Sequence, residues 1–130
     1  MSAEAEQRAY ILYVEDNPLV VKAIGAVLDT QGYIWKSVRT VEAALCELKI
    51  GCHLPDLILV DLVLPDRSGL DLVTILKSSP RTSWIPIFLI TGYGMSGEDQ
   101  KAMEAGCIAY FMKPVSTKAL IKAMKDHIKE

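Results

Sequence analysis

Acidic, hydroxyl and amino side chains follow four separate apolar runs of this sequence, where a folded chain can bring reactive groups together. The acids are the pair Glu15 and Asp16 and the single Asp61, the hydroxyl belongs to Thr91, and the amine belongs to Lys113. Asp61 comes directly after four aliphatic residues, so the chain carries a carboxylate to the end of a buried segment. A desolvated charge there needs partners, and the other side chains are the candidates.

The types of these side chains favour phosphoryl transfer. Carboxylates that lie close together repel one another and need a cation, and Mg²⁺ prefers oxygen ligands. Phosphoryl transfer depends on positioning and charge neutralisation, and it needs neither imidazole nor thiol. Asp61 is then the nucleophile that takes up the group as an acyl phosphate. Lys113 pairs with one phosphoryl oxygen, and Thr91 donates a hydrogen bond to another.

Apolar runs alternate with amphipathic stretches five times along the chain. This pattern is typical of β/α units that build a doubly wound parallel sheet with helices on both faces. The expected strands span about residues 10–14, 33–38, 57–61, 85–90 and 108–112, and the helices begin near residues 18, 40, 70, 96 and 116. Open sheets of this kind bind ligands beyond the carboxyl ends of their strands, and all five candidate side chains fall at that edge.

Size and charge exclude several other classes of protein. The chain has 130 residues, of which 51% are hydrophobic, and a formal net charge of −2, so we expect one domain and no direct nucleic-acid binding. We assign residues 10–130 to the domain and residues 1–9 to a flexible segment. The three cysteines have neither zinc-site nor disulfide spacing. No signal peptide is evident and no apolar run reaches the roughly 18 residues of a membrane span, so we expect a cytoplasmic protein without membrane contact.

From about residue 10 to residue 128, the chain resembles the receiver domain of two-component response regulators. The matching features are the pair Glu15-Asp16, Asp61 followed by Pro65 and Gly69, Thr91, and Lys113-Pro114. Thr91 lies 30 residues after Asp61, and Lys113 lies 52 residues after it, separations typical of that family. Each motif alone is a weak signal, whereas together they are a strong one.

The resemblance implies a flavodoxin-like sheet in the strand order 2-1-3-4-5. It also implies that Asp61 receives a phosphoryl group from a phosphohistidine on a sensor histidine kinase or a histidine phosphotransfer protein. Mg²⁺ would be held by the carboxylates of Asp16 and Asp61 and the main-chain carbonyl of Val63, with Glu15 acting through water. The peptide bond between Lys113 and proline is commonly cis in the family, which would orient the lysine inward.

The resemblance further implies a conformational switch. On phosphorylation Thr91 shifts toward the phosphoryl oxygen and Tyr110, three residues before the lysine, turns inward. The face that reports the change would be the fourth helix, fifth strand and fifth helix, which would meet an output partner or a second copy of the chain. The last helix carries a basic stripe at Lys118, Lys122, Lys125 and Lys129. This stripe is either a solvated face of the helix or a docking surface for an acidic partner.

Three alternative functions remain. A receiver-like interaction domain that never takes up phosphate would share the fold. A hydrolase of the haloacid dehalogenase type would also use a strand-end aspartate, but it normally needs a second aspartate where this chain has Val63. A flavin-binding module would need a phosphate loop where this chain has acids. We therefore expect no turnover of external substrates, only self-catalysed phosphoryl uptake and loss. Neither Val63 nor Tyr93 can orient a hydrolytic water, so that loss should be slow.

Overall fold

Strands and helices alternate along the chain, and the computed structural model describes residues 8–49, 51–92 and 98–128. The strands are β1 (Tyr10–Val14), β2 (Ile34–Val38), β3 (Leu57–Asp61), β4 (Ile87–Thr91) and β5 (Ala109–Met112). The helices are α2 (Pro18–Thr30), α3 (Val41–Glu47), α4 (Gly69–Lys77), α5 (Glu98–Ala105) and α6 (Thr117–His127). All five β/α units that the sequence predicts are present.

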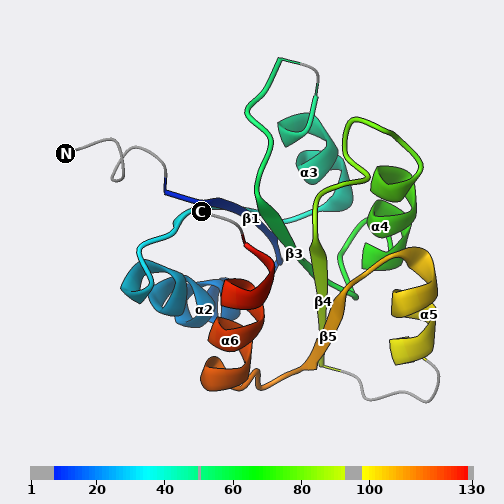
Figure 1. Ribbon diagram of the computed structural model, residues 1–130. Helices are drawn as coiled ribbons and strands as arrows, with labels where there is room; N and C mark the ends of the chain where they lie inside the picture. Colours follow the sequence, from blue (N-terminus) through cyan, green and yellow to red (C-terminus); the bar gives the residue numbers. More distant parts are fainter. Residues whose placement is uncertain (1–7, 50, 93–97, 129–130) are drawn as a thin grey trace.

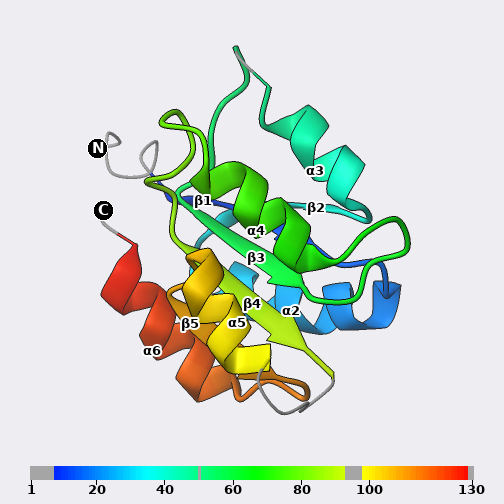
Figure 2. The same ribbon diagram turned by 90° about the vertical axis from the view of Figure 1, so that its right-hand side faces the viewer.

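The five strands form one parallel sheet in the order β2-β1-β3-β4-β5, which confirms the expected topology. Helices α2 and α6 cover one face of the sheet, and α3, α4 and α5 cover the other (Figure 1). The view turned by 90° shows α4 and α5 lying across the central strands β3 and β4 (Figure 2). Two helical layers therefore cover the faces of the sheet, and the candidate polar side chains lie at the carboxyl ends of its strands.

The central strands are buried on both faces, because helices pack on each side of them. Every residue of β3 and of β4 is buried, and both strands read as continuous apolar runs up to a final polar residue. The α3–α4–α5 side of the sheet contains one apolar cluster and the α2–α6 side another. Only Asp61 and Thr91 interrupt this pattern in β3 and β4, each at the carboxyl end of its strand.

Local signals in the sequence explain where several helices begin. The side chain of Asn17 accepts hydrogen bonds from the first-turn N–H groups of α2, and Pro18 occupies the first turn, where its missing N–H costs nothing. Ser116 caps α6 in the same way. Gly32 has φ of +80°, which lets the chain leave α2 and turn into β2.

The fourth strand differs slightly from the expected range of residues 85–90. It begins at Ile87, because the N–H of Ile85 bonds to the carbonyl of Thr82 in the preceding turn, and it extends to Thr91, which pairs with Met112. Of the N-terminal segment 1–9, only residues 8 and 9 are among the described residues. Ala9 is buried, and its carbonyl accepts from Ile34 N at 2.9 Å. Within the described ranges, no helix is long and apolar enough to cross a membrane.

Candidate functional site

Three carboxylates from two neighbouring strands meet at the carboxyl end of the sheet. Glu15, Asp16 and Asp61 each place one oxygen within 4.8 Å of the others. Glu15 is 1% exposed and Asp61 is 4% exposed, whereas Asp16 is half-buried. Acids that are this close and this poorly solvated need a cation, and their oxygen atoms are of the type that Mg²⁺ prefers. The three acidic side chains among the residues expected at the metal site are therefore gathered at one point.

Glu15 is fixed in this cluster by the turn between β1 and α2. Its N–H donates to the carbonyl of Val38 at 2.9 Å, which extends the β1–β2 pairing beyond Val14. Its Oε2 atom accepts from the N–H of Asn17 at 3.2 Å, the same residue that caps α2. The start of the helix and the position of the acid are thus set by the same short turn.

Lys113 brings a positive charge to two of these acids. Its Nζ atom lies 2.8 Å from Glu15 Oε1 and 3.2 Å from Asp61 Oδ2. The Lys113-Pro114 bond is cis, and the N–H of Lys113 donates to the carbonyl of Thr91 at 2.7 Å. This backbone bond links the end of β4 to the segment that carries the lysine.

Burial and pairing change the proton affinities of both partners. Burial lowers the pKa of Lys113, but its contacts with Glu15 and Asp61 outweigh that effect and hold the pKa above its usual value. Burial raises the pKa of Glu15, Lys113 opposes that shift, and repulsion from Asp61 adds to it. Lys113 is therefore a fixed cation, whereas burial and the nearby carboxylate of Asp61 favour the protonated form of Glu15.

The loop after Asp61 packs tightly against the strand end. The N–H of Gly69 donates to the carbonyl of Leu62 at 2.7 Å, and Val63 pairs with Ser68 across the loop. A Cβ atom at position 69 would lie only 2.1 Å from the carbonyl oxygen of Asp61, so only glycine fits there. This close approach is a physical reason for the Gly69 motif that the sequence alone does not reveal.

Asp66 attaches the same loop to a helix that is distant in the sequence but adjacent in space. Its two carboxylate oxygens accept hydrogen bonds from the N–H groups of Val41 and Glu42, both at 3.0 Å, in the first turn of α3. Thr40 caps that helix as well, through Ala43 N. Sequence analysis missed this role of Asp66, because the contact joins residues more than twenty positions apart and no local motif marks it.

Thr91 and Tyr110 lie on the two strands next to Asp61. Thr91 is fully buried, and strand register puts it one position beyond Ile90, the partner of Asp61. Tyr110 is half-buried and packs against the apolar cluster on the α3–α4–α5 side. Tyr110 pairs with Leu89, two positions before Thr91, so alternation along the strands places both side chains on the same face.

The structure describes only one of the two residues that we expect beside the path of a hydrolytic water. Val63 is exposed, and its N–H points to Asp61 Oδ1 at 3.4 Å. Tyr93 lies outside the described residues. The assignment of the Val63 carbonyl as a metal ligand stays a prediction.

Comparison with known proteins agrees with this geometry. The model of the response regulator receiver domain family matches residues 11–125, and the chain belongs to that family. It is a receiver domain of the kind used in two-component signalling. Among curated relatives, the polar-differentiation response regulator DivK of Brucella ovis is 34% identical over 119 residues, covering 91% of this chain and 94% of DivK.

Two solved structures give the same fold. A putative response regulator from Chloroflexus aurantiacus is 28% identical, with a TM-score of 0.86, over 92% of this chain and 97% of that one. The receiver domain of a sensor histidine kinase from Pseudomonas aeruginosa is 26% identical, with a TM-score of 0.82, over 92% and 97% of the two chains. The latter structure contains a magnesium ion coordinated in its active-site cleft.

Proposed function

We propose that Asp61 is the phosphoacceptor of this receiver domain. The observation that carries the proposal is the contact of one lysine ammonium with two buried carboxylates, at 2.8 Å to Glu15 and 3.2 Å to Asp61, beside the third acid Asp16. A carboxylate oxygen of Asp61 attacks the phosphorus of a phosphohistidine. The new P–O bond forms as the P–N bond breaks, and the imidazole leaves with the electron pair and takes up a proton.

The residues around Asp61 would bind the metal ion and the oxygens of the phosphoryl group. Asp16, Asp61 and the carbonyl of Val63 would hold Mg²⁺, with Glu15 acting through water. The ion supplies charge neutralisation between the acids and the incoming phosphoryl oxygens. Lys113 pairs with one phosphoryl oxygen, and the Thr91 hydroxyl donates to another. Charge neutralisation and positioning are the main requirements of phosphoryl transfer, and these side chains meet both.

Mass measurement after incubation with Mg²⁺ and acetyl phosphate tests this proposal. The wild-type chain should gain one phosphoryl group, which hydroxylamine should remove because it cleaves acyl phosphates. Asp61→Asn should gain none, whereas Asp71→Asn, which alters an exposed acid of α4, should behave as wild type. Absence of uptake by the wild type would favour an inert interaction domain, and repeated hydrolysis of external phosphate esters would favour the hydrolase.

A groove beside Lys113 supports a phosphohistidine protein as the donor. It measures about 500 Å³, and α2 contributes Leu19, which is 76% exposed. Its other apolar lining residues include Val20, Val27, Pro114 and Val115. An exposed apolar surface next to the reacting carboxylate suits a partner helix. Leu19→Glu should slow transfer from phosphorylated sensor histidine kinases while leaving uptake from acetyl phosphate unchanged.

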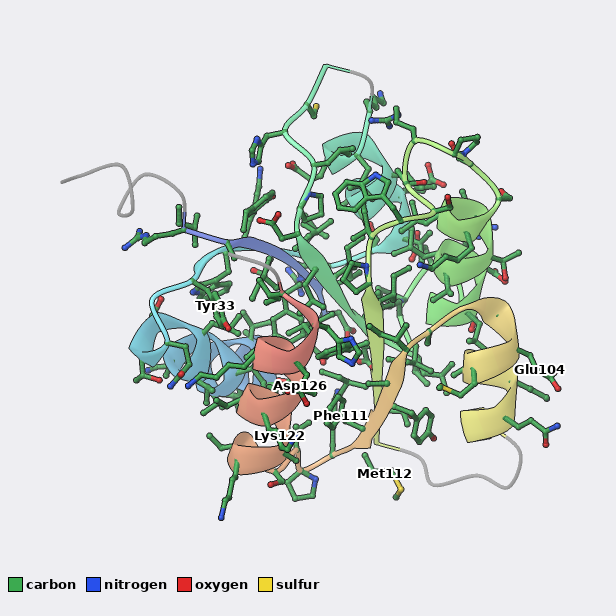
Figure 3. The ribbon with its side chains drawn as sticks, viewed as in Figure 1. Tyr33, Glu104, Phe111, Met112, Lys122 and Asp126 are labelled. Carbon is green, nitrogen blue, oxygen red and sulfur yellow. The ribbon has the colours of Figure 1, made fainter. Side chains whose placement is uncertain are left out.

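We further propose that the phosphorylated state is read on α5, β5 and α6, through Thr91 and Tyr110. Met103 of α5 and Met112 of β5 are both about half exposed on this surface, and Figure 3 shows Met112 at the end of its strand. Exposed methionines adapt to partner surfaces. Measurement of the oligomeric state with and without phosphoryl donor distinguishes an output partner from a second copy.

The basic residues of α6 are candidates for the same interface. Lys118, Lys122 and Lys125 are exposed, and Lys122 pairs with Asp126 of the same helix at 2.9 Å (Figure 3). If the partner is a second copy of the chain, its acids that could meet this stripe are Glu98, Asp99 and Glu104 of α5. Lys129 and the side chains of Glu98 and Asp99 lie outside the described residues, whereas Glu104 is exposed. Charge reversal at Lys122 and Lys125 that left every association constant unchanged would remove this hypothesis.

We expect the domain to act in the cytoplasm.

Loss of the phosphoryl group should be slow. Neither Val63 nor Tyr93 has a carboxylate or amide to orient an attacking water. Phosphorylated protein freed of donor should persist for minutes or longer, and a half-life of seconds would contradict this expectation. Gly92, beside the acceptor strand, leaves room for small phosphodonors.

A further inference from the structure

Tyr13 is a fully buried residue of β1, two positions before Glu15. Its hydroxyl makes no well-aligned hydrogen bond in the part of the chain that the structure describes, although it interacts with the Glu15 carboxylate closely enough for that contact to raise its pKa. Among the buried side-chain polar atoms of those residues, one other shares this property, and it is Oε1 of Glu15. Lys113 lies 2.8 Å from that oxygen as an ion pair without hydrogen-bond alignment. Buried polar groups without an aligned hydrogen bond are rare, so two so close in sequence need an explanation.

The strand geometry places these two groups on the same side of the sheet. Residues two apart in a strand point to the same face, and Tyr13 packs in the apolar cluster beneath α2 and α6. Burial raises the pKa of Tyr13, and the carboxylates of Glu15 and Asp61 raise it further. The phenol is therefore a neutral hydrogen-bond donor that lies within the electrostatic influence of both acids.

We propose that Tyr13 is a positioning residue of the acidic site, whose hydroxyl donates a hydrogen bond to the Glu15 carboxylate when Lys113 moves from Glu15 to a phosphoryl group on Asp61. This inference rests on the proposed function of Asp61. The lysine is now shared between two carboxylates, and a phosphoryl group adds negative charge on the Asp61 side alone. Glu15 would then remain as a buried carboxylate whose cation has moved away. The hydroxyl of Tyr13 replaces that lost interaction and keeps Glu15 oriented for its metal-bound water.

Tyr13→Phe removes the hydroxyl and keeps the ring, so it isolates this role. Calorimetry should measure Mg²⁺ binding in two arms, with Mg²⁺ alone and with Mg²⁺ plus beryllium fluoride, which mimics the phosphoryl group. We expect the variant to bind Mg²⁺ about tenfold more weakly in the beryllium fluoride arm, the size typical of a hydrogen bond to a charged group, and nearly as wild type in the other. An equal effect in both arms, or none in either, would overturn the proposal.

Two controls separate a positioning role from a structural one. Tyr10→Phe alters a half-buried tyrosine at the opposite end of β1 and should change neither arm. In a Glu15→Gln background, Tyr13→Phe should lose most of its effect, because the charged acceptor is gone. If the two substitutions act independently, Glu15 is not the acceptor and the proposal fails.

A spectroscopic measurement on the wild type avoids dependence on any variant's folding. With ¹³C-labelled tyrosine, the Cζ resonance of Tyr13 should shift on addition of Mg²⁺ and beryllium fluoride, and more than on addition of Mg²⁺ alone. An unchanged resonance in a protein that binds beryllium fluoride would refute the proposed role of Tyr13 but not the proposed function of Asp61. A wild-type protein that binds neither beryllium fluoride nor phosphoryl group would instead refute the proposed function.

Discussion

The ammonium nitrogen of Lys113 lies 2.8 Å from Oε1 of Glu15, closer than its 3.2 Å contact with Asp61. Glu15 follows the first strand and Lys113 the last, so this contact joins the two halves of the chain at the edge of the sheet. Both acids are almost fully buried, whereas the lysine is partly exposed. One cation therefore offsets the repulsion between acids from neighbouring strands.

Removal of this cation should destabilise the metal-free domain. Lys113→Met leaves two buried carboxylates without their partner, and we expect the free energy of unfolding to fall by roughly 2 kcal/mol, below the cost at a fully enclosed pair because the site is open to water. Urea unfolding with and without Mg²⁺ checks this, and Mg²⁺ should restore more stability to the variant than to the wild type. Lys122→Met, which breaks an exposed pair with Asp126, should cost less than about 1 kcal/mol. Equal stability of Lys113→Met and wild type in EDTA would contradict the prediction.

Glu15 should give the metal-free domain a specific pH dependence. Its pKa is raised in the folded state by burial, so folding favours the protonated acid. Its contribution to stability is then most favourable below the ordinary value of 4.5 and is lost as pH rises through the raised pKa. Urea midpoints in EDTA should therefore decline with pH above that value more steeply for wild type than for Glu15→Gln. Parallel curves for the two proteins would show that Glu15 is not responsible.

Gly69 should tolerate no side chain. A Cβ atom there would meet the carbonyl oxygen of Asp61 at 2.1 Å and a methyl carbon of Val60 at 2.8 Å. Because backbone must move to relieve the clash, we expect Gly69→Ala to cost about 1–3 kcal/mol and to lower phosphoryl uptake. Gly92→Ala is the control for stability but not for uptake, since the nearest atom to its added methyl group lies 3.9 Å away. Chemical denaturation and the mass assay together measure both effects, and a Gly69→Ala protein as stable as the control would refute the steric argument.

Asp66→Ala should loosen the first turn of α3. Desolvation raises the pKa of Asp66, but hydrogen bonds from backbone N–H groups, including those of Glu42 and Val41, outweigh it and leave the pKa below its ordinary value of 3.8. The stabilisation is therefore present above that value and lost as pH falls through the lowered pKa. Amide hydrogen exchange at Val41 and Glu42 should be faster in Asp66→Ala at neutral pH. Asp66→Asn, which keeps one acceptor oxygen, should show a smaller increase, and unchanged exchange in both variants would exclude the contact.

Much of the fold could be predicted because local signals and the global arrangement agree. The buried run before Asp61, the cap at Asn17 and the turn at Gly32 each specify an element without distant contacts. The convergence of the acids with Lys113 followed from topology, since carboxyl ends of parallel strands meet at one edge. The expected start of β4 at Ile85 was wrong by two residues, because Ile85 is as apolar as the strand itself and a turn hydrogen bond sets the boundary.

The rest of the site depends on contacts between distant residues. No local pattern shows that Asp66 binds the backbone of α3, or that Lys113 lies nearer to Glu15 than to Asp61. The buried hydroxyl of Tyr13 is likewise invisible in a sequence, where its ring reads only as part of a β-strand. Period-two alternation from Glu15 was the one signal that could have indicated it.

The loop between β3 and α4 has a fixed length. Three attachments hold it, namely the Val63–Ser68 pairing, the Gly69–Leu62 hydrogen bond and the anchorage of Asp66 on α3. An inserted or deleted residue here would break at least one attachment and displace the carbonyl groups that follow Asp61. Changes in chain length within this protein should therefore be accommodated elsewhere, for example in the exposed segment at Gly51–His53 that leads into β3.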